Sequence, residues 1–196
     1  AKPEHLVQSA IMGSIYAELM LGIENPRVGL LNIGEEETKG NELTLVTYPL
    51  LKAETLINFI GNVEGRDVNK GTVDVVVCDG FVGNVVLKFA EGLATAIMTM
   101  VRDAILREGI LAKVGGLLIK PALRKLKEKL DPEAYGGALL LGVRAPFFIC
   151  HGSSKAKAIK NAIRAAIDGI KQDICARIEE DIANQTQADT VVGRMK

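Results

Sequence analysis

Short apolar runs alternate with longer segments of helical periodicity along this chain. Three mainly apolar runs, at 28–33, 58–61 and 73–78, are predicted to be buried strands. Continuous rather than alternating apolar positions are typical of strands covered on both faces in a parallel sheet. A further run at 146–150 is expected to be the last strand. The pattern therefore predicts an α/β fold: a parallel sheet between helices, with right-handed crossovers.

Helices are predicted where apolar positions recur every three or four residues. We expect them over 3–21, over 42–57 and from Asn84 to about Arg107, with Pro49 kinking or interrupting the second. A final helix is predicted after Ser153, which is a plausible N-cap. One face of this helix carries isoleucines at helical spacing: Ile159, Ile163, Ile167, Ile170, Ile174, Ile178 and Ile182.

The segment 109–132 is predicted to be a basic amphipathic helix, interrupted at Gly115-Gly116 and at Pro121. Such a helix fits four roles: it lies on a membrane, docks an acidic partner, packs in a dimer or packs against its own domain. We expect a single α/β domain over 1–196, with 109–132 projecting from it. The candidates for membrane or partner contact are Leu117, Leu118, Lys120, Arg124 and Lys125.

The composition narrows the classes of function. Lys plus Arg and Asp plus Glu each total 24, so the net charge is zero and nothing points to nucleic acid. Three sparse cysteines match neither a zinc site nor a disulfide framework, which favours a reducing cytoplasm. No apolar run is expected to reach membrane-spanning length, and no signal peptide is predicted. Because the chain begins at Ala1, we expect a fragment whose upstream part is missing.

Polar, glycine-containing loops follow all four predicted strands, at 35–41, 62–67, 79–84 and 151–154. Ligands of open α/β sheets bind beyond the carboxyl ends of the strands. The four loops therefore predict one shared ligand-binding rim. In the 79–84 loop, glycines and a helix N-terminus suit an anion, but a tight turn with Asn84 as the helix cap fits equally well.

Three further residues each allow two interpretations. Lys39 could bind phosphate as a point charge, or it could pair with Glu35, Glu36 or Glu37 as a solvated lysine. His151 could be a general acid, or a neutral residue that hydrogen-bonds at the end of the sheet. Cys78 could be a nucleophile near a helix N-terminus, or a buried and inert thiol.

Five motifs, in order along the chain, carry a resemblance to a known family. They are RVGLLNIGEEE at 27–37 with KGNE at 39–42, NFIGNVE at 58–64 with Arg66-Asp67, DGFVGNV at 79–85, YGGA at 135–138 and HGSS at 151–154. With these motifs the chain resembles the bacterial phosphate acyltransferases of phospholipid synthesis, the PlsX family. The likeness runs from the first residues to the final helix without a large gap.

The resemblance implies a fold similar to isocitrate dehydrogenase and phosphate acetyltransferase. It implies that inorganic phosphate attacks a long-chain acyl thioester on acyl carrier protein, without cofactor or metal. Lys39 and Asn84 are then the candidate catalytic residues, and the pocket is shaped by Gly40, Asn41, Asp79, Gly83 and His151. The family further implies a cytoplasmic homodimer at the membrane surface, where a membrane-bound glycerol-phosphate acyltransferase takes the acyl phosphate.

Two alternatives stay open. A metal- and nicotinamide-dependent dehydrogenase of the same fold class would need clustered carboxylates, for which Asp67 and Asp79 are the candidates, and the chain has no nucleotide fingerprint. A catalytically inactive half that dimerises and contacts a membrane would also fit. Full-length family members have a further upstream segment that includes the first strands of the sheet, so part of the pocket is unaccounted for.

Overall fold

The computed structural model describes residues 1–129, 136–152 and 154–193. They form two compact units: one comprises 1–80, 139–149 and the chain from 164 onward, and the other comprises the remaining residues. The fold is mixed α/β. The first unit holds a parallel sheet in the order β2-β1-β3, so the predicted parallel arrangement is confirmed for three strands.

The central strand is β1 (Arg27–Asn32), which lies between β2 (Asn58–Glu64) and β3 (Val75–Val77). Four consecutive residues of β1, 28–31, are buried, as the continuous apolar run predicted. Leu30 is paired with Asn62 on one side and with Val77 on the other. The carboxyl ends of all three strands therefore lie at one edge of the sheet.

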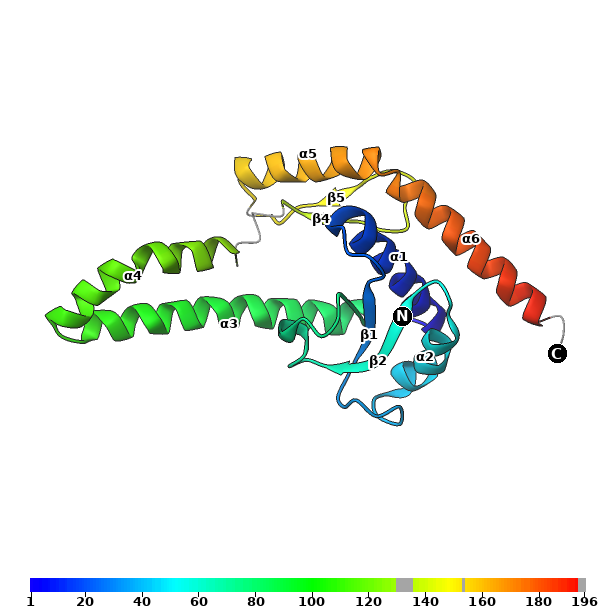
Figure 1. Ribbon diagram of the computed structural model, residues 1–196, viewed down its shortest axis with the longest axis horizontal. Helices are drawn as coiled ribbons and strands as arrows, with labels where there is room; N and C mark the ends of the chain where they lie inside the picture. Colours follow the sequence, from blue (N-terminus) through cyan, green and yellow to red (C-terminus); the bar gives the residue numbers. More distant parts are fainter. Residues whose placement is uncertain (130–135, 153, 194–196) are drawn as a thin grey trace. The chain divides into compact units, whose positions relative to one another are not determined.

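The helices α1 (Pro3–Leu21) and α2 (Glu42–Ala53) pack against each other and against the sheet (Figure 1). Gly22 ends α1 in the left-handed conformation, with φ of 69°, and its N–H donates to the Glu18 carbonyl. The largest fully buried side chains come from both helices, the sheet and the C-terminal region: Leu6, Ile11, Val28, Leu30, Thr47, Leu51 and Ile174. Burial of this apolar surface is the main force that holds the unit together.

Two predictions around α2 and β2 are wrong in detail. Helix α2 runs through Pro49 without interruption, but it ends at Ala53 rather than at Ile57. Strand β2 continues to Glu64, so the expected loop at 62–67 begins three residues later. Pairing with β1 extends the strand beyond its apolar part, because Asn62 and Val63 find backbone partners there.

The predicted fourth strand does not belong to the parallel sheet. A separate two-stranded sheet is formed by β5 (Phe148–Ile149) and β4 (Ala138–Leu139). The backbone N–H of Leu140 donates to the carbonyl of Phe147 at 2.7 Å, beside the short ladder. Since β5 pairs elsewhere, the expectation of one rim shared by four loops is wrong for the loop at 151–154.

The predicted final helix is two helices, α5 (Ala156–Lys171) and α6 (Ile174–Gly193). Asp173 separates them in the left-handed region, with φ of 51°. Ile174 and Ile178 are buried, whereas Ile159, Ile163, Ile167 and Ile170 of α5 are exposed. The isoleucines therefore do not form one buried face. The predicted cap, Ser153, lies outside the described residues.

The second unit contains α4 (Ile110–Lys129) and all but the first residue of α3 (Gly80–Arg107). Helix α3 begins at Gly80, so the predicted loop at 79–84 is already helical from its second residue. By length and composition α3 could cross a membrane, with a mean hydropathy of 1.4, which corrects the expectation that no run is long enough. No part of its most apolar stretch is buried, and the core helices of soluble proteins also have this length and composition.

Helix α4 continues through Gly115, Gly116 and Pro121, so the expected interruptions are wrong, although its ribbon bends along its length (Figure 1). Gly116 lies close to α3: a Cβ placed there would be 2.6 Å from Cγ2 of Ile105. The end of the predicted basic segment, 130–132, lies outside the described residues. The expectation that 109–132 projects from a single domain stays a prediction.

Candidate functional site at the carboxyl end of the sheet

A tight turn follows β1 and presents Lys39. The backbone N–H of Lys39 donates to the carbonyl of Glu36 at 3.1 Å, which closes a four-residue turn. The side chain of Lys39 is exposed. Its stem runs over Gly34, where a Cβ would lie 3.0 Å from Cγ of Lys39 and 2.8 Å from Oε2 of Glu36. A glycine at 34 thus leaves room for the lysine to lie across the strand end.

Gly40 links this turn to helix α2 and needs to be glycine. Its φ is 112°, a conformation that L side chains rarely adopt. A Cβ there would overlap Oγ1 of Thr44 and would lie 2.5 Å from Oδ1 of Asn32. Any side chain at 40 would therefore displace either the turn or the start of the helix.

Asn41 is the N-cap of α2. Its Oδ1 accepts the backbone N–H of Thr44 at 2.9 Å, and Oγ1 of Thr44 accepts the backbone N–H of Asn41 at 3.0 Å. This reciprocal capping box fixes the entry of the chain into the helix. The structure therefore brings Lys39, Gly40 and Asn41 together at the positive end of a helix dipole, which is an arrangement suited to an anion.

The glutamates beside Lys39 do not neutralise it. Glu37 instead pairs with Lys52 on α2 at 2.7 Å and accepts the hydroxyl of Tyr48 at 3.2 Å. The hydrogen bond from Lys52, more than that from Tyr48, lowers the pKa of the Glu37 carboxyl. Across the residues that the structure describes, the Lys39 ammonium has no ion pair. The interpretation of Lys39 as a lysine paired with 35–37 is therefore wrong.

The end of β2 carries charges that are paired with one another. Arg66 forms an ion pair with Glu64 at 2.9 Å. Asp67 is buried; it pairs with Lys70 at 2.9 Å and accepts the backbone N–H of Glu64 at 3.0 Å. These contacts, led by Lys70, lower the pKa of Asp67. Asp67 thus stabilises its own turn, and the described residues hold no group of three metal-binding side chains that would include it.

The end of β3 leads directly into α3. Asp79 is half-buried and lies at the same sheet edge as the turn at 36–39, because β3 is parallel to β1. Burial, and to a smaller extent Asp79, raises the pKa of the Cys78 thiol, which favours the inert interpretation of that cysteine. Gly83 and Asn84 lie inside α3, with Asn84 exposed. Asn84 is therefore not the helix cap.

The remaining candidates belong to the second unit. His151 is exposed after β5, and its carbonyl accepts the N–H of Ser154 at 2.9 Å. On α4, all five predicted contact residues are exposed, with Leu117 at 67% and Leu118 at 77%. The structure thus groups Lys39, Gly40, Asn41 and Asp79 at one edge of the sheet. It places Gly83, Asn84 and His151 in the other unit.

Two asparagines at this edge, Asn32 and Asn62, were not predicted from the sequence to have a role. Nδ2 of Asn32 donates to the carbonyl of Lys39, and Nδ2 of Asn62 donates to the carbonyl of Glu36, both at 2.9 Å. Asn62 is only 7% exposed. The available signal was a polar residue within or directly after an apolar strand, since buried amides need hydrogen-bond partners.

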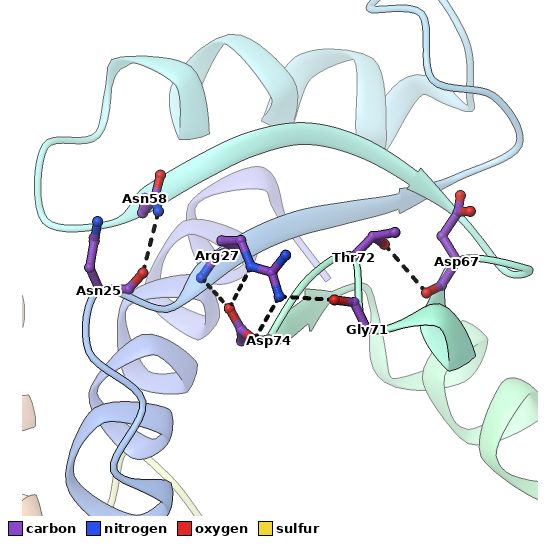
Figure 2. Close-up of polar contacts among 7 residues, drawn as sticks. All are labelled: Asn25, Arg27, Asn58, Asp67, Gly71, Thr72 and Asp74. Carbon is purple, nitrogen blue, oxygen red and sulfur yellow. Dashed lines mark hydrogen bonds and ion pairs between the residues drawn. The ribbon is translucent and has the colours of Figure 1, made fainter.

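At the opposite, amino end of the sheet, one ion pair and several hydrogen bonds join the strands to nearby loops (Figure 2). The guanidinium of Arg27 donates twice to Asp74, from Nε at 2.9 Å and from Nη2 at 3.0 Å, and its Nη2 also donates to the carbonyl of Gly71. Nδ2 of Asn58 donates to the carbonyl of Asn25 at 3.3 Å. These contacts connect β1 and β2 to their neighbouring loops without leaving the arginine unpaired.

Comparison with known proteins shows the family of this chain. Residues 1–177 match the family model described as "Fatty acid synthesis protein". The chain is 58% identical over 187 residues to the phosphate acyltransferase of Heliobacterium modesticaldum, which covers 95% of this chain and 55% of that protein. It is 58% identical over 172 residues to the phosphate acyltransferase of Aquifex aeolicus, which covers 88% of this chain and 50% of that protein. The chain spans about half the length of the curated relatives it matches.

Proposed function

This chain belongs to the fatty acid synthesis protein family, and from that membership we propose that it carries part of the active site of a phosphate acyltransferase. The proposed reaction joins inorganic phosphate to the long-chain acyl group of acyl-[acyl carrier protein]. A phosphate oxygen attacks the thioester carbonyl, a C–O bond forms and the C–S bond breaks. The carrier thiolate leaves and takes up a proton, which gives acyl phosphate and free carrier protein.

The observation that carries this proposal is the exposed ammonium of Lys39, which lies beside the N-terminus of α2 and has no ion pair among the described residues. Phosphate is already an anionic nucleophile, so the protein needs mainly to bind it, align it and stabilise the oxyanion that forms at the thioester. We assign to Lys39 the binding of phosphate or of this oxyanion, and to Asn84 the donation of a hydrogen bond. Gly40, Asn41, Asp79, Gly83 and His151 shape the pocket.

Several finer features belong to the same proposal. The complete fold is similar to isocitrate dehydrogenase and phosphate acetyltransferase, and the enzyme is a cytoplasmic homodimer. Its partners are acyl carrier protein and an anionic membrane surface, or a membrane-bound glycerol-phosphate acyltransferase. Exposed leucines and cations on the same helix, α4, support a membrane contact.

The reaction is tested with the complete enzyme, acyl-[acyl carrier protein] and ¹⁸O-labelled phosphate. We expect the label in the intact acyl phosphate, read by mass spectrometry, and free carrier thiol in equal amount. A reaction without phosphate is the control. Thiol release without acyl phosphate would contradict the proposal. A rise in melting temperature with a nicotinamide cofactor would favour the dehydrogenase alternative.

The membrane contact is tested separately with liposomes that contain anionic lipid. Leu118→Glu should weaken binding even at high salt, because apolar insertion contributes about 25 cal/mol per Å² buried and is not screened. Lys125→Glu should weaken binding mainly at low salt, since each basic residue contributes roughly 1 kcal/mol that salt screens. If neither substitution alters binding, α4 is not the membrane contact.

A further inference from the structure

The turn that presents Lys39 is held at both ends by asparagine side chains from neighbouring strands. Its own hydrogen bond, from the Lys39 N–H to the Glu36 carbonyl, closes the turn. Asn62 on β2 donates to that same Glu36 carbonyl, and Asn32 on β1 donates to the carbonyl of Lys39. The first and last residues of the turn are therefore each tied to the sheet through a side-chain amide.

The two amides are fixed in orientation. Oδ1 of Asn32 accepts the backbone N–H of Ile33 at 2.9 Å, so its Nδ2 must face the Lys39 carbonyl. The Glu36 carbonyl is an acceptor only, so it selects Nδ2 of Asn62 in the same way. The carbonyl oxygen of Asn62 is left buried with no hydrogen-bond partner in the part of the chain that the structure describes.

That unpartnered oxygen argues against a purely structural role for Asn62. A buried acceptor without a donor destabilises the folded state, and an apolar side chain of similar size would avoid this cost. Asn62 is also at a core position, paired in register with the buried Leu30. The clear benefit of an amide at this position is its hold on the turn that carries Lys39.

We propose that Asn32 and Asn62 are positioning residues, which hold the turn at 36–39 so that the Lys39 ammonium faces the bound phosphate. This inference rests on the proposed function of Lys39. Neither asparagine needs to touch the substrate. Both act through the backbone of the turn, and small displacements of a positioned charge lower the rate strongly.

Asn62→Leu in the complete enzyme tests the proposal, with Asn58→Leu as the matched control. Asn58 lies on the same strand and also donates to a backbone carbonyl, but at the amino end of the sheet (Figure 2). We expect Asn62→Leu to lower kcat about tenfold or more. Its melting temperature should equal or exceed that of the unmutated enzyme, and Asn58→Leu should keep full turnover.

Asn32→Asp provides a second variant that changes one atom of the amide. It keeps the acceptor for the Ile33 N–H, replaces the donor to the Lys39 carbonyl with an acceptor and adds a negative charge. We expect lower kcat together with faster hydrogen exchange at the Lys39 amide, whereas amides of β1 exchange as before. This variant remains informative even when the substitution at 62 prevents folding.

The outcomes separate the two proposals. Full turnover in folded Asn62→Leu, or in Asn32→Asp, would overturn the positioning role while leaving the proposed reaction intact. Full turnover in Lys39→Met, or no acyl phosphate from the unmutated enzyme, would instead overturn the proposed function. If Asn62→Leu and the control Asn58→Leu lose turnover to the same extent, a specific role for Asn62 is refuted as well.

Discussion

Arg27 and Lys39 are cations at opposite ends of the same parallel sheet, and their surroundings differ sharply. The hydrogen-bonding groups of Arg27 are directed at Asp74 and Gly71, and Asp74 also accepts the backbone N–H of Arg27 (Figure 2). Lys39 has no such partner among the described residues, although three glutamates precede it in sequence. A charge that is satisfied within the chain stabilises the fold, whereas an unsatisfied one is available to a ligand.

The largest effect that this comparison predicts follows from replacing Lys39. Lys39→Met should lower the rate of acyl phosphate formation by the complete enzyme on the order of 10²-fold or more. The substitution removes the positive charge that is proposed to stabilise the reacting groups. The melting temperature should stay unchanged, because the ammonium forms no ion pair with any residue that the structure describes. Wild-type turnover at saturating phosphate would show that the unpaired charge has no catalytic role.

Asn84→Ala tests the second residue of the predicted catalytic pair, Lys39 and Asn84. Asn84 is exposed in the interior of α3 rather than at its cap, so alanine should raise the free energy of unfolding by up to about 0.7 kcal/mol or leave it unchanged. Turnover should nevertheless fall at least tenfold if the amide donates to the reacting groups. Glu91→Ala, on the same helix, is the control. Equal turnover in both variants would remove Asn84 from the mechanism.

Gly40→Ala tests how strictly the backbone beside Lys39 is determined. The substitution should destabilise the protein by about 1–3 kcal/mol, because φ is 112° and the new Cβ overlaps Thr44. Gly65→Ala is a matched control at the end of β2, where a Cβ meets nothing within 4 Å. Chemical denaturation of both variants measures the difference. A Gly40→Ala protein as stable as Gly65→Ala would mean that the turn relaxes easily.

The smallest effects on turnover are expected from substitutions at the amino end of the sheet. Asp74→Asn should lower the melting temperature and leave turnover unchanged, with exposed Glu24→Gln as a control near the same end. The hydrogen bonds from Arg27 hold the pKa of Asp74 below its usual range. Its stabilising contribution is therefore present above the pKa of the unfolded chain, about 4, and is lost as the pH falls below that value.

Denaturation across pH 2–7 measures this contribution. The stability difference between the unmutated protein and Asp74→Asn should be fully present near neutral pH. It should shrink as the solution is acidified, because both proteins are then uncharged at position 74. A difference that stays constant with pH would show that the carboxylate charge of Asp74 does not contribute.

The sequence predicted the grouping of Lys39, Gly40 and Asn41, because all three lie between one strand and the helix that follows it. It did not predict that Glu37 pairs with Lys52, which is 15 residues away and reaches it only once α2 has formed. For the same reason it gave no role to Asn62, which acts on a carbonyl 26 residues earlier in the chain. Partners at such separations are determined by strand register, and periodicity does not encode it.

The sequence by itself determined the three parallel strands and the first helix, because continuous apolar runs and local end signals such as Gly22 act over a few residues. The tertiary structure decided that β5 pairs with β4, and that the long isoleucine pattern is broken at Asp173. It also decided that Arg27 is paired, whereas Lys39 has no ion pair among the described residues. Those outcomes depend on which surfaces meet when distant segments pack, and the free energy of packing overrides a local pattern.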